Sequence, residues 1–421
     1  MSAQGGGAPT RVVSTVGPVL IIGSGLLGAS LGLALRAGGV GVYLEDASPT
    51  SLRLASDVGA GVAFGDVIDE AGVASADAGQ DGAGYEAPRI VVVATPPDVA
   101  DRIIVDSLVR FPNAIVTDVA SVKDAVVADV LATLAQRGLQ DEACRYVGSH
   151  PMAGRERSGA GAADADLFYG RPWVIVAHEL TWPRAVLAAR ALATDVGAVP
   201  LEMNAGTHDH AVALVSHVPQ LVSSMLAARL VDAPAQALGL AGQGLRDTAR
   251  IAASDPRLWT AILAGNAGPV ADILRELRGD LDDLLTHLDA AAELGPLRGG
   301  SVGAINRVMT AGNQGVARIP GKHGGAPSRY REVEVLIPDE PGALGRLFSE
   351  LGEASINIED LVLEHSAGAQ AGVARVMIDP AVADRCAADL QERGWRLITH
   401  YNNLDEENHR MNDSMRQDAI A

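Results

Sequence analysis

The chain has few aromatic residues, few cysteines and no excess of positive charge, and each shortage excludes a class of protein. Aromatic residues make up 3% of its 421 residues, so its hydrophobic cores must be built mainly from Ala, Val and Leu. The two cysteines, Cys144 and Cys386, lie far apart, which argues against a disulfide framework and fits a reducing compartment. A formal net charge of −19 argues against nucleic acid or an anionic membrane surface as partner. It does not exclude a small anionic substrate, because a local cluster of Arg and His can outweigh a distant net charge.

The sequence also lacks a long uninterrupted hydrophobic run. The first apolar stretch, Val16 to Leu35, is broken by five glycines and predicts a strand, a turn and a helix rather than a membrane span. Residues 1–16 are mostly small and polar and carry no signal-peptide core, so we predict a disordered leader and a cytoplasmic protein. The length allows two or three domains.

The N-terminal part alternates short apolar runs with helix-compatible segments. Such runs suit the strands of a parallel sheet that is buried on both faces. We therefore predict an α/β, Rossmann-like nucleotide-binding domain with a doubly wound parallel sheet over residues 17–181, in which residues 71–84 form a surface loop. The predicted strands are Val19 to Ile22, Val42 to Leu44, Ile90 to Ala94, Ala114 to Asp118 and, as the last of the sheet, Pro172 to Ala177.

The rest of the chain changes texture twice. Residues 182–317 are rich in Ala and Leu at helical spacing and predict an all-helical second domain. Residues 318–328 predict a linker, and strand patterning then returns. The order βαββαβ over residues 329–402 predicts a small ferredoxin-like α+β domain, followed by a polar tail at residues 403–421.

A glycine-rich turn follows the first predicted strand and opens a helix. In this pattern Gly23 permits a tight turn, Gly25 lets the backbone approach a pyrophosphate, and Gly28 lets the helix pack closely on its strand. Asp46, 18 positions after Gly28, can accept hydrogen bonds from an adenosine ribose and would repel a 2′-phosphate, so NAD is favoured over NADP; Glu45 is the competing assignment. A glycine-rich structural turn is the alternative in a chain with 47 glycines. The predicted cofactor-binding turn consists of Gly23, Ser24, Gly25, Leu26, Leu27 and Gly28.

Two further strand ends carry polar residues where ligands of such sheets collect. Thr95 follows the strand that ends at Ala94, although a strand stopped by proline is an equal alternative. Ser121 follows the strand that ends at Asp118, where its hydroxyl can cap a helix and also face the nicotinamide. We therefore count Thr95 and Ser121 among the residues predicted to bind the cofactor.

His150 is the candidate base. The residues after it, Pro151, Ala153 and Gly154 among them, are small and leave space beside the imidazole. A neutral imidazole has a pKa suited to removing a hydroxyl proton near neutral pH. A buried structural histidine is the alternative for an isolated residue, and it is the companion residues that favour the catalytic interpretation.

The helical part supplies those companions. His217 precedes Val218 and Pro219 in a helix that the proline should kink. Arg246 and Arg250 share one helix face, and Asp247 beside them can hold a guanidinium that clamps a carboxylate at two points. A surface ion pair is the alternative for these three residues.

Taken together, these motifs resemble the prephenate/arogenate dehydrogenase family. The similarity covers about residues 17 to 315, and the combination is far more specific than any single motif. The segment after the linker resembles an ACT domain, an amino-acid-sensing module appended to some members. The matching segments are Gly23 to Gly28, Asp118 to Lys123, Ser149 to Gly154 with Glu156, Ser216 to Pro219, Arg246 to Pro256 and Trp259.

The resemblance implies the roles of the catalytic residues. His150 would accept the proton of the ring 4-hydroxyl of prephenate, and Ser121 would position that hydroxyl beside the nicotinamide. Loss of a hydride to NAD and of the ring carboxylate as CO2 would give the aromatic product, 4-hydroxyphenylpyruvate, in tyrosine biosynthesis. Because aromatisation is strongly downhill, the enzyme mainly needs alignment and proton removal.

The resemblance also implies substrate, effector and partner assignments. Arg250 would bind a substrate carboxylate, His217 would line the side-chain end of the pocket, and a homodimer would form through the helical domain. Glu156 and Asp247 would tune access through ionic contacts, and Trp259 would close the site. The residues that would bind tyrosine or another amino acid in the ACT-like domain are Asp339, Gly342, Ala343, Leu344 and Asn357. No metal ligand is predicted.

One departure bears on substrate preference. Several family members carry histidine where this chain has Gln220, which can hydrogen-bond but cannot carry charge. The choice between prephenate, which has a keto group there, and arogenate, which has an ammonium, is therefore open. A β-hydroxyacid dehydrogenase and a non-catalytic sensor of NAD and an amino acid are more remote alternatives.

Overall fold

The computed structural model describes residues 13–66, 86–155, 157, 159–320, 330–365 and 371–398. The chain forms two compact units: Met1–Gly239 with Leu245–Gly279, and Leu240–Gly244 with Asp280–Ala421. The first contains an eight-stranded sheet and the second a four-stranded sheet.

The eight-stranded sheet has the order β3-β2-β1-β4-β5-β6-β7-β8. Its strands are β1 (Val19–Ile22), β2 (Val42–Glu45), β3 (Val62–Ala63), β4 (Ile90–Val93), β5 (Ile115–Asp118), β6 (Tyr146–Pro151), β7 (Pro172–Val176) and β8 (Val199–Glu202). The helices around it are α1 (Leu26–Ala37), α2 (Pro49–Asp57), α3 (Pro97–Arg110), α4 (Asp124–Gln136) and α5 (Pro183–Asp195).

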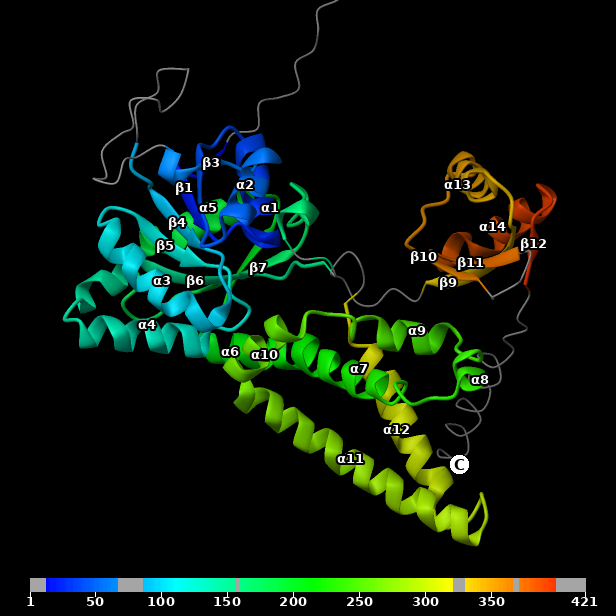
Figure 1. Ribbon diagram of the computed structural model, residues 1–421. Helices are drawn as coiled ribbons and strands as arrows, with labels where there is room; N and C mark the ends of the chain where they lie inside the picture. Colours follow the sequence, from blue (N-terminus) through cyan, green and yellow to red (C-terminus); the bar gives the residue numbers. More distant parts are fainter. Residues whose placement is uncertain are drawn as a thin grey trace, which may run out of the picture. The chain divides into compact units, whose positions relative to one another are not determined.

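Helices cover both faces of this sheet, as the unbroken apolar strands predict. In β1 the side chains of Val19 and Ile21 enter one hydrophobic core, together with residues of α1 and α5. Leu20 and Ile22 enter a second core on the opposite face, with residues of α3 and α4. Figure 1 shows α3 and α4 on one side of the strands. The central strands are therefore buried on both sides, and their ends define where a ligand can reach the sheet.

The sheet differs from the prediction at its far end. It is not wholly parallel, because β7 runs antiparallel to β6. The predicted last strand is followed by α5 and by β8, which pairs parallel to β7, so the sheet extends past the predicted boundary at residue 181. The short β8 contains Pro200, which an edge strand tolerates, and proline together with its brevity hides it in the sequence.

The predicted leader is wrong for its last residues. Residues 1–12 lie outside the described residues, but Thr15 is buried, and the backbone N–H groups of Ser14 and Thr15 donate to Asp195 Oδ2 at 2.9 and 2.6 Å. Asp195 is the last residue of α5, so a tertiary contact holds a segment whose composition alone suggests disorder. The loop predicted at residues 71–84, linker residues 321–328 and the tail at residues 403–421 also lie outside the described residues.

Helices follow the large sheet, as predicted. They are α6 (Ala205–Val212), a π-helical turn (Ala213–His217), α7 (Val218–Ala228), α8 (Ala235–Leu238), α9 (Gln243–Arg250), α10 (Pro256–Gly265), α11 (Ala267–Leu294) and α12 (Ser301–Val316). The continuous stretch Ala205–Ala228 is apolar and long enough to cross a membrane by length and composition alone. It carries buried His208, Asp209 and His217, which bond to other elements, as expected of a helix packed within a domain.

The C-terminal sheet has the predicted βαββαβ element order. Its elements are β9 (Arg331–Pro338), α13 (Ala343–Glu353), β10 (Asp360–His365), β11 (Ala371–Ile378), α14 (Pro380–Glu392) and β12 (Arg396–Leu397). The strands are antiparallel in the order β10-β11-β9-β12. Alternate residues of β9 and β11 are buried together with Leu347 of α13 and Cys386 of α14. This is the ferredoxin-like arrangement that the alternating strands indicate.

Candidate active site

The glycine turn between β1 and α1 has the geometry of a nucleotide-binding loop. Gly23 has φ +103°, and a Cβ there would lie 2.4 Å from the carbonyl oxygen of Ala94. A Cβ on Gly28 would lie 1.9 Å from the carbonyl oxygen of Gly23, so any larger residue would push the helix off the turn. A Cβ on Gly25 would meet nothing within 4 Å. The turn is therefore closed on its protein side and open where a ligand would approach.

A cavity of about 700 Å³ lies beside this turn, lined by Gly23, Gly25, Asp46, Thr95 and Arg110 among others. The hydroxyl oxygen of Thr95 is buried and has no hydrogen-bond partner among the described residues, a deficit that a bound ligand would correct. Leu26 and Leu27 begin α1 and pack against the core, so their side chains support the turn.

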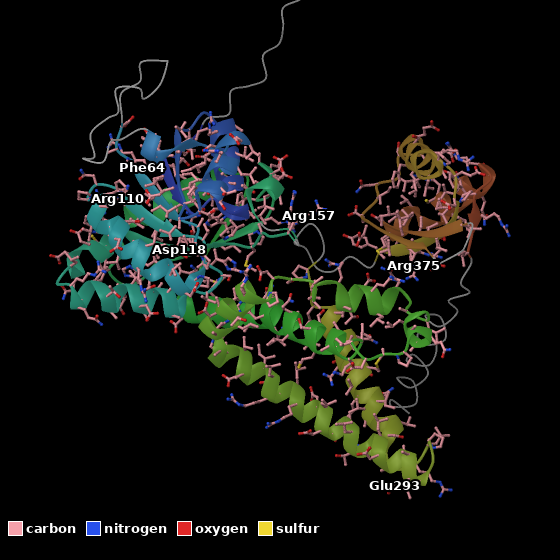
Figure 2. All side chains as sticks on the ribbon, in the orientation of Figure 1. Phe64, Arg110, Asp118, Arg157, Glu293 and Arg375 are labelled. Atoms are coloured by element: carbon pink, nitrogen blue, oxygen red, sulfur yellow. The ribbon has the colours of Figure 1, made fainter. Side chains whose placement is uncertain are left out.

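The two acidic residues at the end of β2, Glu45 within the strand and Asp46 just after it, have different partners. Asp46 Oδ2 accepts from the backbone N–H and the hydroxyl of Ser24, at 2.6 and 2.7 Å, and its Oδ1 accepts from the N–H of Ser48. Glu45 instead forms an ion pair of 2.7 Å with Arg110, whose guanidinium lies over the ring of Phe64 (Figure 2). Asp46 thus joins the glycine turn directly, and a carboxylate has lone pairs enough to accept from a ribose as well.

Other predicted site residues lie along the same edge of the sheet. Strands β1, β4, β5 and β6 are parallel, so their carboxyl ends lie side by side. Thr95 comes after β4, Ser121 after β5, and His150 is next to last in β6. The sequence did not predict β6, because Tyr-Val-Gly-Ser-His-Pro has too little apolar pattern. That strand places His150 on the edge where ligands of such sheets bind.

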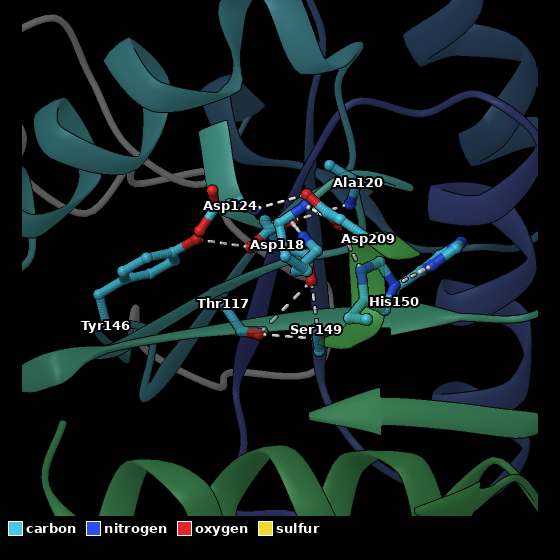
Figure 3. Close-up of polar contacts among 10 residues, drawn as sticks. Thr117, Asp118, Ala120, Asp124, Tyr146, Ser149, His150 and Asp209 are labelled. Carbon is cyan, nitrogen blue, oxygen red and sulfur yellow. Dashed lines mark hydrogen bonds and ion pairs between the residues drawn. The ribbon is translucent and has the colours of Figure 1, made fainter. Parts of the chain in front are cut away.

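His150 is buried against a second histidine (Figure 3). Its Nδ1 lies 2.8 Å from Nε2 of His208, and the Nδ1 of His208 lies 2.7 Å from Oδ1 of Asp209. Burial, and then the neighbouring His208, Lys123 and His217, hold the pKa of His150 well below its usual value. The imidazole is therefore neutral near pH 7 and can act as a proton acceptor.

A buried polar cluster supports the strand beneath His150. Asp118 Oδ1 pairs with the ammonium of Lys123, and its Oδ2 accepts from the hydroxyl of Tyr146 at 2.8 Å. Burial and the Asp118 carboxylate raise the pKa of Tyr146 well above its usual value, so the phenol stays a donor. Ser149 donates to the carbonyl oxygen of Asp118 at 2.7 Å. Buried hydrogen bonds thus join the end of β5 to β6 beside the site.

The predicted helix cap at Ser121 is wrong. Helix α4 begins at Asp124, and its preceding residue, Lys123, makes no side-chain cap. The carboxylate of Asp209 instead accepts from the backbone N–H groups of Lys123 and Asp124, each at 2.9 Å. A residue from α6 therefore performs the capping, which frees the Ser121 hydroxyl for other contacts.

The helical part brings three of its predicted residues together. His217, at the end of the π-helical turn, accepts from the amide of Asn266 at Nδ1 (3.0 Å) and meets the ring of Trp259 edge-on, with 6.1 Å between centroids. Gln220 is buried in α7, and its Oε1 accepts from the hydroxyl of Ser254 at 3.5 Å. Burial lowers the pKa of His217 to about 4, with the nearby Asp209 opposing and His208 adding to the shift.

Most of the other predicted residues lie on α9 or in the C-terminal unit. Arg246, Asp247 and Arg250 have exposed side chains on α9, and Glu156 lies outside the described residues. In the C-terminal unit Gly342 caps α13 in the left-handed region, and the amide of Asn357 donates to Glu359 Oε1 at 2.6 Å. Asp339, Ala343 and Leu344 occupy the same turn and the start of α13.

The sequence reasoning missed His208 and Asp209. Both are almost fully buried, at 0% and 2% exposed. Their signal was an adjacent His-Asp pair on the helix that also carries His217, but only the tertiary contact with His150 gives it meaning.

Comparison with known families identifies the family of this chain. Residues 31–202 match the family described as "Prephenate dehydrogenase, nucleotide-binding domain", and residues 204–293 match "Prephenate dehydrogenase, dimerization domain". A protein of Streptomyces niveus named "Probable prephenate dehydrogenase NovF" is 32% identical over 381 residues, covering 89% of this chain and 98% of that protein. The chain belongs to the prephenate dehydrogenase family. The family resemblance is thereby confirmed, while the ACT assignment stays a prediction.

Solved structures of the family have the same fold. Prephenate dehydrogenase from A. aeolicus, in complex with hydroxyphenyl propionate and NAD+, is 26% identical with a TM-score of 0.57; the match covers 70% of this chain and 97% of that one. Arogenate dehydrogenase from Synechocystis is 25% identical with a TM-score of 0.52, covering 71% of this chain and 98% of that one. Both substrates of the predicted pair thus occur among similar proteins.

Proposed function

We propose that this chain is an NAD-dependent prephenate dehydrogenase that converts prephenate to 4-hydroxyphenylpyruvate and CO2 in tyrosine biosynthesis. The observation that carries the proposal is a buried, neutral His150 on the sheet edge that also holds the glycine turn. Family membership supports the same reaction.

The cavity beside the glycine turn suits a dinucleotide. The open space at Gly25, the unpartnered hydroxyl of Thr95 and the carboxylate of Asp46 are the features such a ligand requires. We assign the pyrophosphate to the Gly23–Gly28 turn and the adenosine ribose to Asp46. NAD supplies the hydride acceptor when it is bound. A carboxylate at Asp46 would repel a 2′-phosphate, which favours NAD over NADP.

The protein's own contribution is alignment and proton removal. His150 would accept the proton of the ring hydroxyl at Nε2, the nitrogen that does not face His208. Ser121, at the end of the neighbouring strand, would position that hydroxyl. Loss of the hydride and of CO2 leaves an aromatic ring, so the barrier would fall mainly through orientation of the substrate.

The helical part would hold the rest of the substrate. His217 and Gln220 lie near Trp259 and Ser254, and we place the substrate side chain there. We assign a carboxylate to Arg250, with Asp247 and Glu156 adjusting access. Gln220 is buried and neutral, which suits a keto group as a hydrogen-bond acceptor and provides no charge for an ammonium.

Turnover measurements test this function. Purified full-length protein is given prephenate or arogenate, each with NAD and then with NADP, and NADH or NADPH is followed by absorbance. We expect turnover of prephenate with NAD. Preference for arogenate would change the assigned substrate but not the roles of the catalytic residues. No turnover of either substrate would refute the proposal.

We also propose a homodimer formed through the helical part. Exposed apolar residues support it, among them Val222, Met225 and Leu226 of α7 and Leu281, Leu285 and Leu288 of α11. The match to a dimerization domain over residues 204–293 agrees. Light scattering after gel filtration should give twice the chain mass; a monomer at micromolar concentration would refute the dimer. We also propose that the protein is cytoplasmic.

We propose further that the C-terminal unit is an ACT domain that binds tyrosine or another amino acid. Its ferredoxin-like sheet and the exposed turn at Gly342 support this assignment. The effector would lie near Asp339, Ala343, Leu344 and Asn357. If the assignment is right, Asn357→Ala in the full chain weakens inhibition by tyrosine. Inhibition that is unchanged and competitive with prephenate would place tyrosine at the active site instead.

A further inference from the structure

A single chain of hydrogen bonds runs from a carboxylate to the candidate base. Asp209 Oδ1 lies 2.7 Å from Nδ1 of His208, and Nε2 of His208 lies 2.8 Å from Nδ1 of His150. The two rings meet edge to face, with 5.1 Å between their centroids and 77° between their planes. All three side chains are buried, at 2%, 0% and 9% exposed, so water does not compete for these contacts.

Asp209 is fixed as an acceptor at the start of this chain. Its oxygens accept from the backbone N–H groups of Lys123 and Asp124, each at 2.9 Å, at the positive end of α4. Burial alone would raise the pKa of Asp209, but the hydrogen bonds from His208 and from these two amides lower it overall. The side chain is therefore an ionised carboxylate, which can only accept.

An ionised Asp209 determines where the protons of the two histidines lie. The carboxylate requires a proton on Nδ1 of His208, so a His208 ring that holds one proton presents a lone pair at Nε2. That lone pair requires a proton on Nδ1 of His150, which leaves the lone pair of His150 on Nε2. The opposite tautomer of His150 would carry its proton on Nε2. That nitrogen could then not accept a proton from the substrate.

We propose that His208 and Asp209 are positioning residues for the reaction, which hold the proton of His150 on Nδ1 and keep Nε2 as the proton acceptor. This role rests on the function proposed above. When Nε2 takes the hydroxyl proton, the imidazolium of His150 donates from Nδ1 to His208. The new positive charge is then stabilised by the Asp209 carboxylate through the ring of His208, in the way that a buried aspartate supports the histidine of a serine protease.

The first test reads the tautomer without any substrate. Nitrogen NMR of the full-length protein labelled in histidine distinguishes a protonated from an unprotonated ring nitrogen, and the His150→Asn variant identifies the His150 signals. We expect Nδ1 of His150 to be protonated and Nε2 unprotonated. An Nε2-protonated His150 in the wild-type protein would overturn the proposal.

The second test removes the contact and then restores part of it. His208→Leu deletes the acceptor for Nδ1 of His150, whereas the side-chain oxygen of His208→Gln can occupy the position of Nε2 and accept. We expect His208→Leu to lower kcat about 10²-fold or more, the scale at which a wrong tautomer or a lost base acts, with little change in KM. His208→Gln should recover at least tenfold of that loss. His210→Leu, an exposed histidine on the same helix, is the matched control and should keep wild-type kcat.

The outcomes separate the two proposals. A kcat of His208→Leu within twofold of the wild-type value would overturn the positioning role. If His208→Leu fails to fold, the wild-type NMR tautomer and the kcat of His208→Gln decide the question. A protein with the expected tautomer but no turnover of prephenate or arogenate would refute the proposed function and leave the hydrogen-bond chain intact.

Discussion

Acidification should destabilise this protein through His217, because the folded chain holds that histidine neutral. Burial lowers its pKa from 6.5 to about 4 in the folded state. Its Nδ1 also accepts a hydrogen bond from the side-chain amide of Asn266, which only the neutral ring can do. The unfolded chain therefore binds a proton more readily, and stability is full above pH 6.5 and falls as pH decreases towards 4.

The difference between the pKa of His217 in the unfolded and the folded chain determines how much unfolding free energy is lost on acidification. A complete titration corresponds to about 3 kcal/mol of unfolding free energy, of which about 2 kcal/mol should already be lost at pH 5. The assay is urea unfolding of the wild-type protein and of His217→Asn, from pH 7 to pH 5. The oxygen of the introduced amide can still accept from Asn266, so the variant keeps the contact and loses the titration.

The difference between the two proteins carries the test, since other groups that titrate are common to both. The stability advantage of the wild type should shrink by about 2 kcal/mol between pH 7 and pH 5. NMR titration of labelled histidine gives the pKa of His217 directly. A value near 6.5, or a stability difference that does not change with pH, would refute the argument from burial.

The remaining predictions concern the crevice and the substrate. Gly28→Ala should lower both NAD affinity and the melting temperature of the free protein, whereas Gly25→Ala, with nothing near its Cβ, should lower NAD affinity alone; equal melting temperatures would show that the turn relaxes. His150→Asn should reduce kcat about 10²-fold or more with NAD binding intact by fluorescence titration, and a near-normal rate would place the base elsewhere. Because the pKa of His150 is lowered, the acid limb of the kcat profile should lie below pH 6.5, and a limb above 7 would contradict a buried base. Arg250→Gln should raise the KM for prephenate about 30-fold or more, and Arg246→Gln is the matched control; the reverse result would move the carboxylate clamp to Arg246.

Local patterns were sufficient for the parts of the fold whose cause is local. Strands β1 and β4 are buried on both faces, so they appear in the sequence as unbroken apolar runs. The glycine turn was predictable because Gly23, Gly25 and Gly28 recur at a fixed spacing between an apolar strand and a helix, all within contiguous residues. Strands β9 and β11 alternate because only one side of each faces the core.

Other parts depend on contacts that no local pattern contains. Strand β6 places Tyr146 and Val147 in the hydrophobic cores, but its later residues Ser149 and His150 are buried polar groups that serve the site and break the apolar pattern. The reversed direction of β7 is decided by its pairing with β6. The cap of α4 comes from Asp209, which lies 85 residues along the chain from Asp124.

The sequence by itself determined that this protein holds a dinucleotide-binding turn, a candidate base and a helical part, because each is written in contiguous residues. Only the tertiary structure decided how the base is supported. His150 and His208 are 58 residues apart in the chain, and their contact exists because β6 and α6 pack together. Hydrogen bonding between buried groups depends on distance and on the absence of water, and both are properties of the packed fold.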